Sequence, residues 1–465
     1  MISILEKDTI AALATPHGVG AIAVIRISGA DAICISDKFF FDRNGNSKNL
    51  VSQKGFTVHF GQIVSGGEVL DEVLLSIFKA PHSYTGEDIV EISCHGSEYI
   101  QQQLLTLFFK NGCRPATAGE FTLRAFLNGK FDLTQAEAVA DLIASNSGVS
   151  HQVAMQQMRG GFSSKIKSLR NNLVDFASLI ELELDFSEED VEFANRNDLV
   201  NLLIQLQNLL VKLIDSFELG NVIKNGIPVA IVGKPNAGKS TLLNTLLNEE
   251  RAIVSDIPGT TRDTIEDEIR IDGVLFRFID TAGIRKTQDK IESIGVNKAF
   301  ETIRQASIVL YLFDVHAMSS ADLDLEIDQI RSHLNNNQLL IIANKIDEED
   351  LEYLRTEFDG YENLIFVSAR EGIFIDDLKL KLISLFDQRA VQVNETVITN
   401  ARHAEALRRA NSALYKVMDG LTKNISGELI ATDIRHALNA LGEITGEVTT
   451  DDLLGNIFSK FCIGK

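Results

Sequence analysis

The chain has 465 residues, 45% of them hydrophobic, and a formal net charge of −21 at pH 7. This length suits about three domains, and no segment approaches the roughly 18 uninterrupted apolar residues of a membrane span. The acidic net charge argues against a protein that binds nucleic acid on its own, because neutralising the phosphates requires a concentrated basic surface. We therefore expect any RNA substrate to be bound together with a basic partner.

The four cysteines lie far apart in the sequence and form no C-x-x-C pair. This spacing speaks against a zinc site or a redox motif and is typical of a reducing compartment. The first residues lack a basic region followed by a long apolar stretch, which a secretory signal would require. We expect a cytoplasmic protein without a membrane segment.

Residues 1–126 mix alternating apolar and polar stretches, such as 21–27 and 88–93, with short helical patterns and Gly-rich turns. This mixture predicts an α+β domain. From Leu133 onward, apolar residues recur every three or four positions, which is typical of a helix-bundle core. The first stripe comprises Ile166, Leu169, Leu173, Phe176 and Ile180, and the second comprises Leu199, Leu202, Leu206, Leu209, Leu213 and Phe217.

A glycine-rich loop at 233–240 lies between an apolar run at 228–232 and a helical pattern. Such a loop binds phosphates, because successive backbone N–H groups face inward and the helix N-terminus attracts anions. Lys239 can reach the β- and γ-phosphate oxygens, and Ser240 can offer its hydroxyl to Mg²⁺. A structural Gly-rich turn is the alternative for this segment alone. The expected contacts here are Asn236, Ala237, Gly238, Lys239, Ser240 and Thr241.

The Gly- and Pro-containing segment 256–263 is predicted to be a loop. A hydroxyl in it can complete the Mg²⁺ shell when the γ-phosphate is present, and we assign that role to Thr261. By composition alone the segment is equally consistent with a polar turn. The candidates for nucleotide contact are Ser255, Asp256, Ile257, Pro258, Gly259, Thr260 and Thr261.

A second motif follows the apolar stretch 274–279 and comprises Asp280, Thr281, Ala282 and Gly283. At a strand tip, the Asp280 carboxylate can hold Mg²⁺ through water, and the Gly283 N–H can meet the γ-phosphate. Asp280 alone would mean little. Its order and spacing relative to the glycine-rich loop make the phosphate-site interpretation stronger.

The residue directly after this motif is unusual. Ras-like enzymes place a water-orienting glutamine there, whereas Ile284 can neither orient a water nor accept a proton. Another group must therefore do that work. Candidates lie in the charged stretch 285–292, which composition alone would assign to a solvated loop.

A third motif, Asn344, Lys345 and Asp347, follows the apolar run 339–343. An aspartate there can accept hydrogen bonds from the N1–H and the exocyclic amine of guanine. Adenine has an acceptor at N1, so Asp347 would select GTP over ATP. A second loop on the base side is predicted at Ser368, Ala369 and Arg370. Four such elements in this order predict a Ras-like P-loop GTPase domain.

Helical spacing returns after the predicted nucleotide domain, at Leu407, Ala410, Leu414, Val417 and Leu421. A short helical tail would lack a core of its own. We therefore predict an α/β multidomain protein in which a GTPase domain at 223–388 is inserted between two parts of one helical domain. Those two parts are 127–222 and 389–465.

Seven short segments resemble one family closely. They are residues 85–88, 95–96, 119–122, 124–130, 132–138, 259–263 and 461–465. Together they are similar to the MnmE (TrmE) family of tRNA-modification GTPases, and the resemblance spans essentially the whole chain. The nucleotide motifs are shared by many GTPases, but the N-terminal block and the Cys-Ile-Gly-Lys ending are specific. Without the resemblance, Cys462 would be interpreted as an ordinary terminal cysteine, and its chemical role stays open.

The resemblance implies that residues 1–126 form a homodimer and bind 5-formyl- or 5,10-methylene-tetrahydrofolate. The matching positions are Arg26, Glu91, Lys130 and Lys465. A carboxylate can pair with the amino and ring N–H donors of the pterin, while cations meet the glutamate tail. Without the family match, each of these side chains is better explained as part of a surface ion pair.

The resemblance also implies how the missing glutamine is replaced. The family places potassium where other GTPases place an arginine finger, and its ligands match Asn236, Ser255, Ile257 and Thr260. The matching catalytic carboxylate is Glu292, which would orient the attacking water through a bridging water, with Arg285 nearby. Ser255 stands where a threonine is usual, and a backbone carbonyl ligand would make that change harmless.

The implied function is potassium-activated GTP hydrolysis coupled to tRNA modification. A flavoprotein partner, the FAD-dependent MnmG (GidA), would join this chain in a heterotetramer or larger assembly that binds tRNA. The complex would form the 5-carboxymethylaminomethyl or aminomethyl group on the wobble uridine. A ribosome-assembly switch GTPase without folate chemistry is the alternative. A dynamin-like assembly protein is disfavoured, because no amphipathic membrane segment or basic loop is evident.

Overall fold

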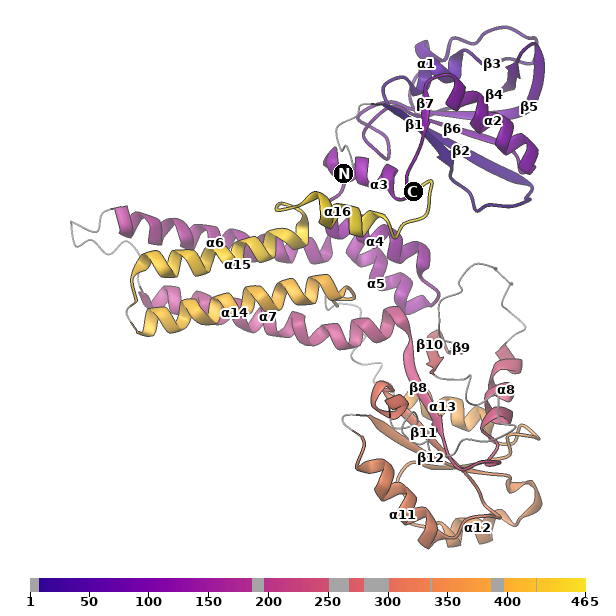
Figure 1. Cartoon of the computed structure of the whole chain (residues 1–465), viewed down its shortest axis with the longest axis vertical. Coiled ribbons are helices and arrows are strands. Elements are labelled where there is room, and N and C mark those ends of the chain that lie inside the picture. Colours follow the sequence, from indigo (N-terminus) through magenta and orange to yellow (C-terminus); the bar gives the residue numbers. More distant parts are fainter. Residues whose placement is uncertain are drawn as a thin grey trace. The chain divides into compact units, whose positions relative to one another are not determined.

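The structure is a computed structural model that describes residues 8–185, 196–250, 267–279, 301–334, 337–385, 397–423 and 425–465. The described residues fall into two compact units (Figure 1). The first has the outer bounds Met1–Ile143, Met155–Gln207 and Ala406–Lys465, and the second has Ala144–Ala154 and Asn208–Glu405. The first unit combines the N-terminal sheet with helices. The boundaries of the three predicted domains therefore stay a prediction.

A seven-stranded sheet in the order β3-β4-β5-β6-β2-β1-β7 forms the N-terminal part of the first unit. Its strands are β1 Thr9–Leu13, β2 Ile22–Ser28, β3 Phe40–Phe41, β4 Thr57–Ser65, β5 Glu68–Phe78, β6 Ile89–His95 and β7 Cys113–Pro115. Only the pairing of β1 with β7 is parallel. Strand β6 alternates as expected, with Val90, Ile92 and Cys94 buried, while Glu91 lies on the opposite, partly open face. The buried face packs on α1 Ala32–Asp37 and α2 Glu98–Lys110, near the 3₁₀ turn η1 Leu50–Ser52.

Helices make up the rest of the first unit. They are α3 Glu120–Leu127, α4 Leu133–Ala144, α5 Gly148–Met158, α6 Gly161–Asp185, α7 Arg196–Asn225, α14 Ala401–Thr422, α15 Gly427–Thr445 and α16 Asp451–Phe458, with α5, α7 and α14 continuing into the second unit. Helices α6 and α15 lie side by side (Figure 1), and an ion pair of 2.7 Å joins Arg170 to Glu447 just beyond α15. Helix α16 shares a small core with α3 and α4. The C-terminal helices therefore pack on helices that precede the nucleotide motifs.

The observed burial agrees with the predicted apolar stripe on α6 but only partly with the one on α7. All five predicted positions of the first stripe, on α6, are buried. On α7, Leu206 and Leu213 are buried as predicted, but Leu202, Leu209 and Phe217 are half-buried, and the buried stripe uses Leu203 and Leu210 instead. The burial of the Leu199 side chain lies outside what the structure describes. Leucines occupy neighbouring positions along α7, so the sequence period alone could not choose the buried face.

The second unit contains a six-stranded sheet in the order β13-β12-β11-β8-β10-β9. Its strands are β8 Ile227–Val232, β9 Asp267–Ile271, β10 Val274–Phe278, β11 Ile308–Asp314, β12 Gln338–Asn344 and β13 Leu364–Val367. All pairings are parallel except that of β9 with β10. One core includes α8 Lys239–Glu250 and α13 Ile375–Leu385, and another includes α11 Ser320–Arg331 and α12 Leu351–Glu357. Burial on both faces explains why these strands are continuous apolar runs.

This topology confirms the predicted fold class and positions the site. In an open parallel sheet, ligands bind outside the carboxyl ends of the strands. The glycine-rich loop follows β8, Asn344 ends β12, and Ser368 follows β13. In the part of the chain that the structure describes, no helix is both long and apolar enough to cross a membrane.

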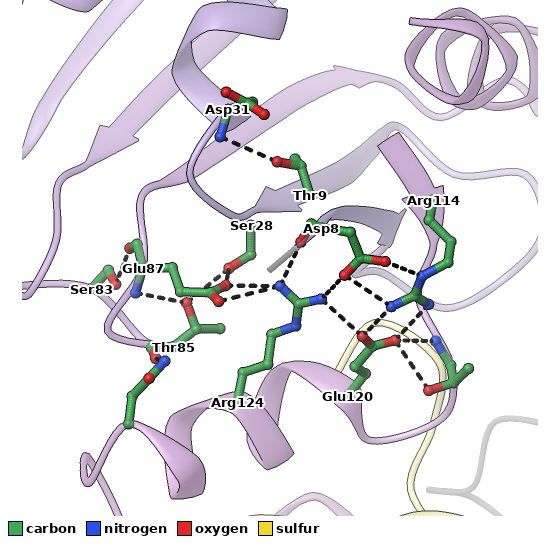
Figure 2. A network of polar contacts seen from close by, with 12 residues as sticks. Asp8, Thr9, Ser28, Asp31, Ser83, Thr85, Glu87, Arg114, Glu120 and Arg124 are labelled. Atoms are coloured by element: carbon green, nitrogen blue, oxygen red, sulfur yellow. Dashed lines mark hydrogen bonds and ion pairs between the residues drawn. The ribbon is translucent and has the colours of Figure 1, made fainter. Parts of the chain in front are cut away.

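An ionic network fixes the start of α3 against the N-terminal sheet (Figure 2). The Arg124 guanidinium, with a side chain 9% exposed, contacts the carboxylates of Asp8 at 2.7 Å, Glu120 at 3.0 Å and Glu87 at 3.2 Å. Arg114 pairs with Asp8 at 2.5 Å and with Glu120 at 2.6 Å. Arg124 therefore joins Glu87 to Glu120, and all three residues lie in the family-like segments.

The same network sets the charge of Asp8. Its hydrogen bond with Arg114 lowers the pKa of Asp8 below the ordinary value, burial opposes this shift, and Arg124 lowers the pKa further. Because the folded-state pKa is depressed, the ionised carboxylate stabilises the fold above the ordinary pKa. That contribution is lost as the pH falls through the folded-state value.

Replacing Arg124 with methionine tests this network. The variant keeps an apolar stem but leaves three carboxylates without their shared cation, so we expect a loss of roughly 3–5 kcal/mol. Calorimetry of the full chain should show a lower unfolding temperature, and hydrogen exchange should be faster in β1. As a control, Arg409→Met removes a half-exposed pair with Glu443 and should cost less than about 1 kcal/mol. An Arg124→Met protein as stable as the control would contradict the assignment.

Candidate nucleotide site and a second polar site

The loop between β8 and α8 needs glycine at two close approaches. Gly233 has φ +151°, and a Cβ there would lie 2.0 Å from the Leu312 carbonyl oxygen. Gly238 has φ +101°, and its Cβ would lie 2.2 Å from Nδ2 of Asn344. Between them, Asn236 adopts the left-handed region at φ +64°. These positions turn the chain back at the tip of β8, so that the loop leads directly into the N-terminus of α8.

Lys239, the first residue of α8, directs its ammonium into this loop. Its Nζ donates hydrogen bonds to the carbonyl oxygens of Gly233 at 2.6 Å and Lys234 at 2.8 Å. Burial lowers the pKa of the Lys239 ammonium, because desolvation disfavours the charged form. An anionic phosphate is a stronger partner than two carbonyls, and the loop already holds the ammonium where such a group would bind. Ser240 and Thr241 follow in the first turn of α8.

Asn344 connects the glycine-rich loop to the loop after β13. Its side chain, in a residue 2% exposed, donates from Nδ2 to the Ala237 carbonyl at 2.7 Å. Its Oδ1 accepts from the Ala369 N–H at 3.0 Å. Thr245 of α8 donates to the Ala369 carbonyl at 2.6 Å. Three segments that are distant in the sequence are thereby held in one arrangement.

Asp347 lies on the exposed side of this arrangement. The Ser368 hydroxyl donates to its Oδ1 at 2.6 Å, and this hydrogen bond lowers the pKa of Asp347 below the ordinary value. The carboxylate is therefore ionised at neutral pH and accepts hydrogen bonds. Ser368 is itself fixed by paired backbone hydrogen bonds with Ile373. Arg370 points outward, with a side chain 82% exposed.

The remaining residues predicted for the nucleotide site lie outside the described residues. They are Ser255, Asp256, Ile257, Pro258, Gly259, Thr260, Thr261, Asp280, Thr281, Ala282, Gly283, Arg285 and Glu292. The described portion of the chain contains no group of three or more His, Cys, Asp or Glu side chains that could hold a metal ion. Sequence reasoning also missed Asp314, which ends β11, and His316, which lies two residues beyond it. The signal for them was available, because both lie at the carboxyl end of a buried strand.

A second polar site lies on the open face of the N-terminal sheet. Arg26 of β2 is directly opposite Glu91 of β6, and two of its nitrogens contact Glu91 Oε1 at 2.8 Å. The guanidinium lies 5.4 Å from the ring centre of Tyr84 and 5.6 Å from that of Phe121. It also donates to the Gly464 carbonyl at 3.3 Å. The two aromatic contacts were not predicted, because they depend on α3 and the 83–88 loop folding against β2.

The C-terminal residues reach this site in the structure. Ile463 forms an isolated β-bridge with Ala118. Gly464 has φ +98°, and a Cβ at this position would lie 2.2 Å from the Leu13 carbonyl oxygen, so only glycine fits. Cys462 is exposed. Of the four predicted folate residues, Arg26 and Glu91 are in contact, and Lys465 follows the glycine that contacts Arg26. The Lys130 ammonium donates to the Pro81 carbonyl at 3.0 Å instead of to any of the other three.

The sheet, the glycine-rich loop before α8 and the Asp347 loop together define a P-loop nucleotide-binding protein of the guanine-nucleotide class. Two family models match the chain, the MnmE helical domain over residues 133–462 and the GTP-binding protein TrmE N-terminus over residues 9–130. The chain belongs to the MnmE family of tRNA modification GTPases.

Curated relatives support this assignment over the full length. The tRNA modification GTPase MnmE of Flavobacterium johnsoniae is 57% identical and covers 99% of this chain and 100% of its own. The protein of the same name from Flavobacterium psychrophilum is also 57% identical, with the same coverage. That from Christiangramia forsetii is 55% identical and covers 99% of both chains.

Proposed function

We propose that this chain hydrolyses GTP and, with a flavoprotein partner, forms the 5-carboxymethylaminomethyl or aminomethyl group on the wobble uridine of tRNA. The observation that carries the GTP part is the ionised Asp347, held by Ser368 beside a loop that Asn344 ties to the phosphate side. Guanine offers two donors to such a carboxylate. Adenine offers an acceptor at N1, which the carboxylate repels.

Mg²⁺ and K⁺ are proposed as the metal ions of the phosphate side. The described candidates supply the oxygen ligands that hard cations prefer: Ser240 at the helix start and the exposed Asn236 in the loop. Ser240 and Thr261 would hold Mg²⁺. The K⁺ ligands would be Asn236, Ser255, Ile257 and Thr260. Bound there, K⁺ supplies positive charge against the oxygen between the β- and γ-phosphates.

Side chains of the protein would bind the phosphates and orient the attacking water. Lys239 would exchange its two carbonyl partners for phosphate oxygens, so binding would cost the breaking of two loop hydrogen bonds. Glu292 would orient the attacking water through a bridging water, with Arg285 beside it. This assignment is needed because Ile284 cannot fill the role of the usual glutamine.

The N-terminal polar site would bind the one-carbon tetrahydrofolate. Glu91 and Arg26 fit this ligand because both are partly exposed, at 27% and 16%, beside the rings of Tyr84 and Phe121. The Glu91 carboxylate would accept from the pterin donors. Lys130 and Lys465 would supply charge for the glutamate tail, which requires Lys130 to leave the Pro81 carbonyl. The folate supplies the one-carbon unit.

The partner assignments follow from family membership. We propose a homodimer that joins the FAD-dependent MnmG in a heterotetramer or larger assembly in the cytoplasm, with tRNA bound by the complex. The net charge of −21 favours this arrangement, because the chain alone is poorly suited to bind RNA. A ribosome-assembly switch GTPase is the second candidate, but nothing about that function requires the Arg26–Glu91 site.

Single-turnover GTP hydrolysis tests the role of K⁺. We expect hydrolysis at least about tenfold faster in potassium than in sodium buffer of equal ionic strength, because only the fitted cation neutralises the developing charge. GDP affinity in the two buffers serves as the control and should agree within a few fold. Equal hydrolysis rates would reject the proposed K⁺ site.

Titration of the full chain with 5-formyl-tetrahydrofolate tests the second site. Glu91→Gln should weaken binding about 10- to 150-fold, the equivalent of one hydrogen bond to a charged group. Glu98→Gln, at an exposed carboxylate at the start of α2, is the matched control and should bind like the wild type. If the wild-type protein does not bind the folate, the ribosome-assembly alternative is favoured.

A further inference from the structure

The end of β11 contacts the Asp347 loop through two side chains. Asp314 Oδ2 pairs with the Lys345 ammonium at 2.5 Å, and its Oδ1 accepts the backbone N–H of His316 at 3.0 Å. The His316 Nε2 lies 3.2 Å from the Lys345 carbonyl oxygen, and its Nδ1 lies 3.3 Å from Glu349 Oε1. His316 therefore contacts the Asp347 loop at both of its ends, at Lys345 and at Glu349.

The span encloses Asp347, the residue proposed to select the base. Lys345 and Glu349 flank the 3₁₀ turn η3 Ile346–Glu348, which contains Asp347. Lys345 adopts the left-handed region at φ +71°, which a non-glycine residue adopts only when its surroundings hold it there. Those surroundings are the Asp314 carboxylate on its ammonium and the His316 ring on its carbonyl. They fix the direction in which the chain enters η3.

The chemistry of these contacts suits histidine. Both groups that face the ring nitrogens are acceptors, a carbonyl oxygen and a carboxylate oxygen. A ring nitrogen that carries a proton donates to whichever acceptor it faces, and the doubly protonated ring donates to both. The side chain is 32% exposed, so no core packing requires a histidine at this position. The structural role of His316 is therefore to contact the Asp347 loop.

We propose that His316 is a positioning residue for nucleobase recognition, which sets the place of the Asp347 carboxylate and thereby how strongly the site prefers guanine to hypoxanthine. The proposal rests on the proposed GTP function. Hypoxanthine has the N1–H of guanine but lacks its 2-amino group. Discrimination between guanine and hypoxanthine therefore depends on where the Asp347 carboxylate oxygen that would accept from the 2-amino group is placed.

The test compares the affinities of GDP and inosine diphosphate for the full chain. The wild type should prefer GDP by about 10- to 150-fold, because inosine diphosphate lacks one hydrogen bond to a charged group. His316→Ala should weaken GDP binding by about tenfold but inosine diphosphate binding by only about twofold, so the preference shrinks about fivefold. His316→Gln, whose amide can donate to the Lys345 carbonyl, should recover part of the preference.

His333→Ala is the matched control. This half-buried histidine contacts the Gln329 carbonyl of its own helix end, and the substitution should leave both affinities unchanged. An unchanged preference in His316→Ala, whether both affinities stay the same or fall equally, would overturn the proposal, because the residue would then be dispensable or merely structural. Failure of the wild type to bind GDP would refute the proposed GTP function instead, and the two failures are thereby distinguished.

Discussion

The candidate nucleotide site depends on one buried amide. The Asn344 side chain uses its donor on the glycine-rich loop and its acceptor on the loop after β13, and both partners are backbone groups. No other side chain of similar size offers one donor and one acceptor in this geometry except aspartic acid in its protonated form. The amide also explains the glycine at 238, since a Cβ there would lie 2.2 Å from Nδ2. The distance between the glycine-rich loop and the loop after β13 is thereby fixed.

The other parts of the site are arranged around this connection. The parallel strands bring Asp314, Asn344 and Ser368 to one sheet edge, because each ends a strand or directly follows one. The hydrogen bond from Ser368 lowers the pKa of Asp347, and the β11 end holds the turn on which Asp347 lies. The N-terminal site follows a different principle. There an ionic network under α3 positions the ring of Phe121 against Arg26, whose other partners come from the adjacent strand β6, the 83–88 loop and the C-terminal residues.

The sequence was most informative where function constrains several neighbouring residues. The glycine-rich loop, the Asn344 motif and the strands before them were predicted within a residue or two, because buried parallel strands are uninterrupted apolar runs and special backbone angles need glycine. The α6 stripe was also predicted. The α7 stripe was placed partly on the wrong residues, since neighbouring leucines leave the period ambiguous. Contacts such as Arg114 with Asp8, His316 with Lys345 and Lys130 with Pro81 join segments whose proximity depends on the tertiary fold, and local patterns contain no information about them.

Asn344 joins the two loops, and we infer that one guanine nucleotide engages both of them. Titration of the Asn344→Ala protein with GDP tests it most directly, because the substitution leaves the Ala237 carbonyl and the Ala369 N–H without their shared partner. We expect a loss of affinity of about 5- to 150-fold, the equivalent of 1–3 kcal/mol, while Asn244→Ala, at an exposed asparagine of α8, should bind GDP like the wild type. Wild-type affinity in Asn344→Ala would show that nucleotide binding does not depend on this side chain.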